Sequence, residues 1–319
     1  MKVSILIHPE ELTEKWIDRM AAEGIDTLGL HPVGGVKAYE TLEALIKLVT
    51  TEKFRSLIDY AKSKGLNVEY EFHAAGYLVH RSLFEKHPEY FRMNEKGERV
   101  NDLNFCVSNA EALDIAAKEA AKLTNLLYGC DERYFFWLDD AAGGKCHCPK
   151  CNALSPSDQQ LTALNAMITE IRKEKPGALL SYLAYYDTLE LPQTVEPADG
   201  IFLEYAPIDK WRRRPGEREK YAENVKRELA SREPLIGYFG SKNSRVLEYW
   251  IDNSLFSGWK KPPQKLECDG DEAMRDIKEY LELGYENIST FGCYLGEDYE
   301  ELYGEPDIKP FTDAVNNNR

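Results

Sequence analysis

The sequence predicts an α/β fold, a (β/α)8 barrel that forms a single domain over residues 1–319. Three observations predict it. Short apolar segments, rich in β-branched and aromatic residues, alternate about eight times with amphipathic helical segments. Several helical segments end at a glycine that a new apolar segment follows, as at Gly24, Gly65 and Gly284. The turn after the first apolar segment, His8-Pro9-Glu10-Glu11, lacks the glycines that a doubly wound, nucleotide-binding sheet needs there.

The predicted strands are apolar nearly throughout, which is typical of parallel strands that are covered on both faces. They span residues 3–7, 27–31, 67–73, 134–139, 179–185, 200–205, 234–239 and 287–291. The predicted helices carry an apolar stripe or are rich in alanine, a strong helix former. They span residues 11–23, 51–64, 111–126, 157–173, 218–231 and 271–283.

Two long segments interrupt this alternation of strands and helices. Residues 74–109 form an insertion after the third predicted strand, and residues 141–156 form a cysteine-rich loop after the fourth. Both follow the carboxyl end of a strand, and excursions of that size are more often functional than idle.

The composition describes an ordinary globular chain and limits its partners. Lys and Arg number 40 against 55 Asp and Glu, so the formal net charge is −15. A nucleic-acid partner is not expected, because phosphate recognition needs clustered cations. No apolar run approaches the roughly 20 residues that span a bilayer, and the run at residues 3–7 is too short for a signal peptide. We therefore expect the chain as written to stay in the cytoplasm, although a chain trimmed of its leader would look the same.

The residues expected at the carboxyl ends of the strands are acidic and aromatic. A barrel keeps its active site at these ends. Aromatic rings stack on sugar rings, while carboxylates and imidazoles hold hydroxyl groups, so we expect a carbohydrate substrate. The candidate substrate-binding residues are His31, Glu71, His73, Tyr185, Glu204, Tyr205 and Tyr238. The sequence shows neither a nucleophile elbow nor a phosphate-binding lysine loop.

Two neighbouring carboxylates, Asp139 and Asp140, follow an aromatic strand and are the candidate catalytic residues. Neighbouring strand residues point to opposite faces, so both reach one pocket only if the strand bends there. If they do, their proximity separates their pKa values, so that one carboxyl stays charged and the other keeps a proton near neutral pH. Acid-catalysed glycosidic cleavage requires this difference. In the alternative reading, Asp139 caps a helix or orders a loop and Asp140 is solvated.

Several motifs in residues 71–207 resemble those of a known barrel family. They are Trp137-Leu138-Asp139-Asp140 with the following Cys146-x-Cys148-x-x-Cys151, and the preceding segments 86–91 and 104–109. The chain resembles a barrel domain long catalogued as of unknown function, which lies near the bacterial α-glucuronidases and contains endo-β-N-acetylglucosaminidases acting on complex N-glycans. The resemblance implies a glycoside hydrolase.

The tandem aspartates also resemble those of hexosaminidases in which the substrate's own acetamido group is the nucleophile. This resemblance implies that Asp139 orients and polarises the acetamido nitrogen and that Asp140 is the general acid. The chain departs from the family pattern at Glu204, where the resemblance predicts no acid. A Glu there can supply an alternative acid or base.

Three other functions stay open. A carboxylate pair drawn from Asp140, Glu204 and Glu71 would suit an α-glucuronidase, with retention at a separation of about 5 Å and inversion at about 6.5–9.5 Å. The uronate would then lie near His73, near His31 or near an arginine of residues 212–214. A non-catalytic glycan-binding barrel is the second alternative. The third is a metal-dependent sugar isomerase or aldolase-like barrel, which needs an open metal site.

Seven cysteines, an odd number, do not form a disulfide framework. Three of them, Cys146, Cys148 and Cys151, crowd one short loop, and Cys106 in the family-like stretch is a plausible fourth metal ligand. Zinc takes four tetrahedral ligands, and Cys-x-x-Cys is a common half-site. We expect a structural zinc with no catalytic role, because a closed thiolate site leaves no open position. No cofactor is expected for catalysis. Reduced thiols or an iron–sulfur cluster are the alternatives.

Overall fold

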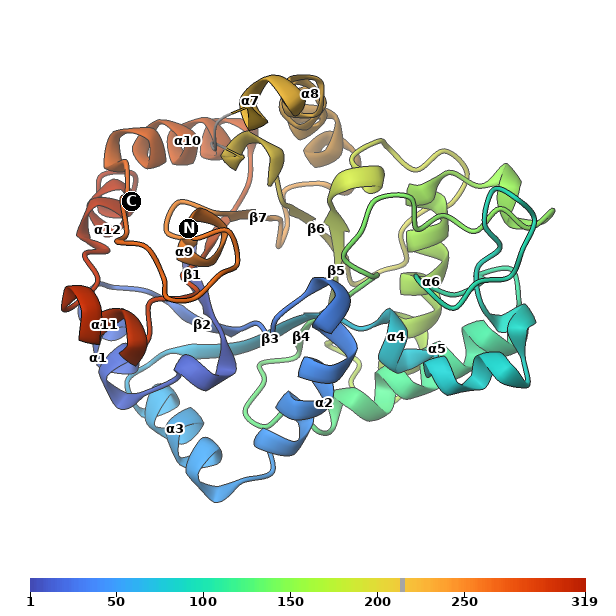
Figure 1. The fold of residues 1–319 in the computed structure, drawn as a ribbon, viewed down its shortest axis with the longest axis horizontal. Coiled ribbons are helices and arrows are strands. Elements are labelled where there is room, and N and C mark those ends of the chain that lie inside the picture. The colour runs from blue at the N-terminus through green and yellow to red at the C-terminus, as the bar shows by residue number, and fades with distance from the viewer. Residues whose placement is uncertain (213–215) are drawn as a thin grey trace. The chain divides into compact units, whose positions relative to one another are not determined.

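In the computed structural model, which describes residues 1–212 and 216–319, eight strands close into one parallel β-barrel (Figure 1). Neighbouring strands follow the order of the chain, which is the topology of a (β/α)8 barrel. The strands are β1 (Lys2–Ile7), β2 (Thr27–Leu30), β3 (Asn67–His73), β4 (Arg133–Trp137), β5 (Leu179–Ala184), β6 (Ile201–Tyr205), β7 (Arg245–Glu248) and β8 (Asn287–Phe291). No helix in these two ranges is both long enough and apolar enough to cross a membrane.

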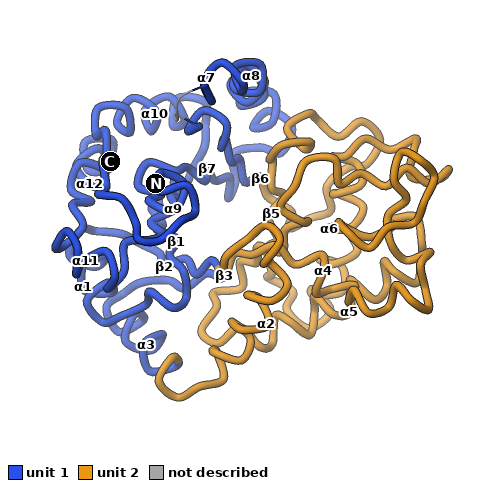
Figure 2. Tube along the Cα trace, in the orientation of Figure 1, with its two compact units in different colours: residues 1–31, 55–69, 204–319 blue, residues 32–54, 70–203 orange. Residues whose placement is uncertain are grey.

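The chain divides into two compact units (Figure 2). The first unit comprises residues 1–31, 55–69 and 204–319, and the second comprises residues 32–54 and 70–203. Strands β1, β2, β7 and β8 belong to the first unit, β4 and β5 belong to the second, and β3 and β6 contribute residues to both.

The first unit carries most of the helices. Helix α1 shows how they form: Thr13 caps it by accepting the Trp16 N–H at 3.2 Å, and the helix buries Trp16, Ile17 and Met20. Helix α10 ends at Gly284, whose left-handed φ of 101° favours glycine. The helices are α1 (Glu14–Ala22), most of α3 (Glu52–Ser63), α7 (Glu217–Lys220), α8 (Ala222–Phe239), α9 (Asn253–Phe256), α10 (Gly270–Leu283), α11 (Glu297–Tyr303) and α12 (Lys309–Asn316).

The second unit contains α2 (Ala38–Leu48), α4 (Ala75–Leu78), α5 (Ala110–Thr124) and α6 (Pro156–Ile171). Asp158 fastens the start of α6 to the chain that follows β5. One of its oxygens completes a capping box with Ser155, and the other accepts the N–H groups of Gln193, Thr194 and Val195 at 2.8–2.9 Å. Burial alone would raise the pKa of the Asp158 carboxyl, but these backbone hydrogen bonds lower it to about 2.

Seven of the eight predicted strands are confirmed to within two residues at each end, and those at 67–73 and 287–291 match in full. The predicted insertion and cysteine-rich loop also stand where expected, between β3 and α5 and between β4 and α6. The seventh prediction is wrong. Residues 234–239 end helix α8, and the strand is Arg245–Glu248. Helix α2 was not predicted.

The seventh strand was not predicted because charged residues lie at both of its ends. Arg245 faces the barrel interior, where Nε lies 3.0 Å from Glu204 on β6 and Nη1 lies 2.7 Å from Glu69 on β3. Since β3 and β7 are not neighbours in the barrel, the second contact crosses the interior. Glu248 accepts hydrogen bonds from Lys210 at 2.7 Å and from Tyr280 of helix α10 at 2.5 Å. These partners neutralise the charges of Arg245 and Glu248 in a strand that is buried throughout.

Candidate active site

Asp139 is held by two residues of the insertion between β3 and α5. Its Oδ2 accepts hydrogen bonds from the Arg81 guanidinium and from the backbone N–H of Asn104. Asn104 in turn accepts the Asp139 N–H at 2.9 Å, and Arg81 donates to the Asn104 carbonyl at 3.1 Å. Two donors to one oxygen, one of them cationic, fix the orientation of this carboxylate.

Asp140 contacts two predicted site residues. Its Oδ1 accepts a hydrogen bond from the Tyr185 hydroxyl at 3.1 Å and lies 3.9 Å from His73 Nε2. A β-carbon built on Gly34 would lie 2.9 Å from Asp140 Oδ2, so glycine is what lets the backbone approach this carboxylate. The Asp140 side chain is 26% exposed, which leaves it open to a ligand.

His73, at the end of β3, presents a defined ring nitrogen to Asp140. Its Nδ1 lies 2.5 Å from the carbonyl oxygen of Leu138, so Nδ1 carries a proton and donates it there. Nε2 is therefore the nitrogen that faces Asp140. It accepts a proton in the neutral ring and donates one in the charged ring.

A pocket in the second unit adjoins these residues. Asp139, His73 and Tyr185 line it, whereas Asp140 contacts the last two without lining it. Strand β4 ends at Trp137, so both aspartates follow the strand and the alternation of strand faces does not separate them. The other lining residues are Asn104, Phe105, Val107, Leu138, Ala141, Gly144, Lys145, Pro156, Gln159, Gln160, Leu183, Asp187 and Thr188.

The two predicted acids other than the aspartates lie inside the barrel. Glu204 is fully buried and forms the ion pair with Arg245, and Glu71 is also fully buried. Glu71 shares a face of β3 with Glu69, which contacts Arg245 across the interior. These placements do not support a catalytic carboxylate pair that includes Glu71 or Glu204.

The remaining predicted residues have separate surroundings. His31 is buried, and its carbonyl oxygen lies 2.7 Å from His8 Nδ1. The Tyr205 hydroxyl donates to the Glu228 carbonyl at 2.8 Å inside the core. Tyr238 lies in helix α8, so the strand end that made it a candidate does not exist there.

Of the arginine run at residues 212–214, Arg212 pairs with Asp209, with Nε 2.7 Å from Oδ1. Its guanidinium carbon lies 4.6 Å from the centre of the Tyr221 ring. Arg213 and Arg214 lie outside the described residues.

Sequence reasoning missed Arg81 and Asn104, the two residues that hold Asp139. Asn104 lies in one of the motifs that carry the family resemblance, so a signal for it was present, whereas nothing in the sequence marks Arg81. The sequence predicts a helix from residue 11, but α1 begins at Glu14, and Glu11 lies between β1 and α1, where it accepts the His8 N–H at 3.2 Å. Burial raises the pKa of the Glu11 carboxyl to about 8, so this acid keeps its proton near neutral pH.

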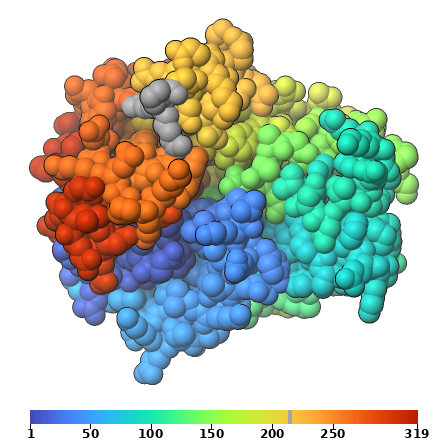
Figure 3. Space-filling model, in the orientation of Figure 1, coloured from blue at the N-terminus to red at the C-terminus, as the bar shows by residue number. Residues whose placement is uncertain are grey.

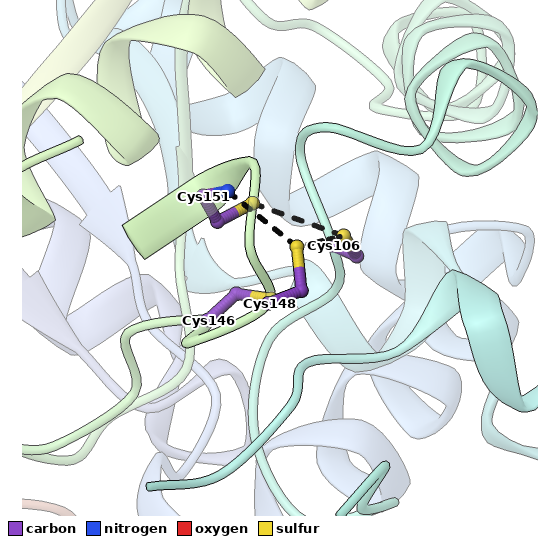
Figure 4. A group of neighbouring side chains, drawn as sticks. All are labelled: Cys106, Cys146, Cys148 and Cys151. Atoms are coloured by element: carbon purple, nitrogen blue, oxygen red, sulfur yellow. Dashed lines mark hydrogen bonds between the residues drawn. The ribbon is translucent and has the colours of Figure 1, made fainter. Parts of the chain in front are cut away.

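The predicted metal ligands lie together in the second unit (Figure 4). The sulfur atoms of Cys106, Cys146, Cys148 and Cys151 all lie within 4.8 Å of one another, and all four residues are buried. His147 points elsewhere, with Nε2 4.0 Å from Glu95. The insertion and the cysteine-rich loop, which supply the four thiols, lie side by side at the surface (Figure 3).

Residues 41–233, more than half of the chain, match the family model described as "Domain of unknown function (DUF4838)". The chain belongs to this family. The DUF4838 segment contains Asp139, Asp140, their contacts to His73, Arg81, Asn104 and Tyr185, and the four clustered cysteines. No curated protein matches the chain.

Solved structures similar to this DUF4838 protein include glycoside hydrolases of several families. The β-galactosidase of Rahnella sp. R3 is 13% identical with a TM-score of 0.55, over 99% of this chain and 55% of that one. A GH20 catalytic module of the pneumococcal exo-β-D-N-acetylglucosaminidase StrH is 14% identical with a TM-score of 0.54, over 99% and 83%. A Bacteroides ovatus GH5 xyloglucanase is 14% identical with a TM-score of 0.51, over 97% and 68%.

The chain spans about half the length of the β-galactosidase. At such identities the likeness shows the fold, which is the barrel of these glycoside hydrolases.

Proposed function

We propose that this protein is a glycoside hydrolase that cleaves a β-linked N-acetylhexosaminide, of N-glycan type or related, with the substrate's acetamido group as nucleophile. One observation carries the proposal: two consecutive carboxylates follow β4, one fixed by Arg81 at the wall of a pocket and the other in contact with His73 and Tyr185. The N-acetylglucosaminidase among the similar structures and the family resemblance of the motifs support this substrate class.

Each carboxylate has a separate part in the proposed reaction. Asp139 accepts a hydrogen bond from the acetamido N–H, and Arg81 and Asn104 keep it in place. The acetamido oxygen then attacks the anomeric carbon while Asp140 donates a proton to the departing glycosidic oxygen. In the second step Asp140 takes a proton from the water that opens the cyclic intermediate. Two attacks at one carbon give overall retention of configuration.

The surroundings of Asp140 support its proposed part in proton transfer. The Tyr185 hydroxyl donates a hydrogen bond to Asp140 Oδ1. His73 Nε2 lies 3.9 Å from the same oxygen, so a small movement or a bridging water would let a proton pass between them. The route needs no enzyme nucleophile and no bound cofactor for the chemical step.

A panel of substrates tests the proposal. Purified protein is incubated with an aryl β-N-acetylglucosaminide, a complex N-glycan and an aldouronic oligosaccharide, and products are measured by chromatography and mass spectrometry. We expect release from an N-acetylhexosaminide only, with a β-configured product in the first minutes of an NMR time course. Product from the uronic acid alone would point to the α-glucuronidase alternative, and binding without product to a glycan-binding barrel. Either result would contradict the proposal.

Gly34→Ala is expected to lower kcat/KM for that substrate about 10- to 100-fold, because the new methyl group displaces the Asp140 carboxylate, and small displacements of reacting groups cost this much. Initial rates measure the effect, and thermal unfolding is expected to change little. Gly237→Ala in helix α8 is the matched control, since its β-carbon would meet no atom within 4 Å. Equal rates for both variants would show that Asp140 needs no precise placement.

A further inference from the structure

We propose that Cys106, Cys146, Cys148 and Cys151 bind one zinc ion in a closed tetrahedral site, and that the ion fastens the wall of the pocket. The proposal concerns a metal site with no part in the chemical step, and it stands whether or not the chain cleaves a glycan. Cys106 comes from the insertion between β3 and α5, and the other three ligands come from the loop between β4 and α6.

The distances between the sulfur atoms fit a single ion. Zinc binds thiolates at about 2.3 Å, which puts the sulfurs of a regular tetrahedron about 3.8 Å apart. Cys106 Sγ lies 3.6 Å from Cys148 Sγ and 3.8 Å from Cys151 Sγ. A disulfide needs about 2.05 Å between the sulfurs. A four-iron cluster places its own iron and sulfide atoms between the thiolates and so holds them further apart.

Hydrogen-bond donors and a cation surround the cluster. The backbone N–H groups of Met93 and Cys151 point at Cys146 Sγ and Cys148 Sγ, at 3.3 and 3.5 Å. The Arg99 guanidinium lies 4.0 Å from Cys146 Sγ. Zinc with four thiolates carries two negative charges, and hydrogen-bond donors and a nearby cation offset such a charge.

Two residues connect the proposed zinc site to the pocket. Gln159, which lines the pocket, accepts the Cys146 N–H at 2.9 Å and donates to the carbonyls of Cys146 and Cys151 at 3.0 Å each. Asn104, two residues before Cys106, holds Asp139 and donates to the Gly144 carbonyl at 3.1 Å. In this proposal the ion therefore joins the insertion to the cysteine-rich loop beside the pocket.

Metal analysis of the wild-type protein is the first test. After gel filtration in a chelator and then in metal-free buffer, we expect one zinc ion per chain by mass spectrometry. A mercurial reagent should release it in step with four thiols. With cobalt(II) in its place, we expect the near-ultraviolet thiolate-to-metal band of a tetrahedral site. Three results would overturn the proposal. The first is a chain without zinc whose seven thiols all react in the native or denatured state. The second is a disulfide among the four cysteines, and the third is bound iron with its visible absorbance.

Serine variants test which cysteines hold the ion. Cys106→Ser and Cys151→Ser are expected to lose the zinc and to speed amide hydrogen exchange in residues 104–109 and 141–156. Cys130→Ser and Cys268→Ser are matched controls, since neither residue belongs to the cluster, and they should keep both properties. Zinc retained at one ion per chain in both cluster variants would overturn the ligand set. If these variants do not fold, the wild-type release experiment decides alone.

Discussion

Asp140→Asn is expected to lower kcat/KM for a natural N-acetylhexosaminide about 100- to 10,000-fold, which is the usual size of a general acid–base contribution. Asparagine has nearly the shape of aspartate and can still accept the Tyr185 hydroxyl, so the pocket should stay intact. It cannot donate a proton to the glycosidic oxygen. Steady-state rates on the N-glycan measure the effect.

The leaving group distinguishes loss of the acid from general damage. A nitrophenolate leaves without a proton, so the first step of Asp140→Asn on a nitrophenyl glycoside should be slowed much less than on the N-glycan. Asp114→Asn, exposed on helix α5, is the matched control and should behave as wild type. A fully active Asp140→Asn would end the assignment.

Arg245→Met is expected to lower the free energy of unfolding by about 3–5 kcal/mol, the usual cost of removing one partner from a buried ion pair. Arg245 is 1% exposed, and its two partners, Glu69 and Glu204, are buried as well. Without the guanidinium, two buried carboxylates lose the cation that both of them contact. Urea denaturation monitored by circular dichroism measures the change. Arg55→Met on the exposed side of α3 is the control, and an equally small effect at both sites would contradict the buried-ion explanation.

The sequence predicted the barrel because most strands are apolar runs that follow a helix end, and both signals are local. It failed at β7, where charges are tolerated only because partners distant in the chain neutralise them: Arg245 lies 176 positions from Glu69. The sequence predicts a strand at the apolar stretch that contains Pro234, but this stretch completes helix α8.

For the candidate site, the sequence singled out the residues whose types carry chemistry and missed those that hold them. Asp139, Asp140, His73 and Tyr185 lie together as their positions after the strands suggested. Arg81 is 58 positions from Asp139, and no local pattern connects the two. The four cysteines were selected by type and spacing, and the structure brings their sulfur atoms together. The bound metal stays a prediction.

Placing both aspartates and their contacts in one of the two units affects how such a chain can diverge. Arg81, Asn104, His73, Tyr185 and Gly34 all belong to the second unit, and so do the four cysteines. Residues 32–54 and 70–203 therefore carry every side chain that the proposed reaction uses, together with the four cysteines. An exchange of residues 204–319 between relatives would leave the identity of all these side chains unchanged.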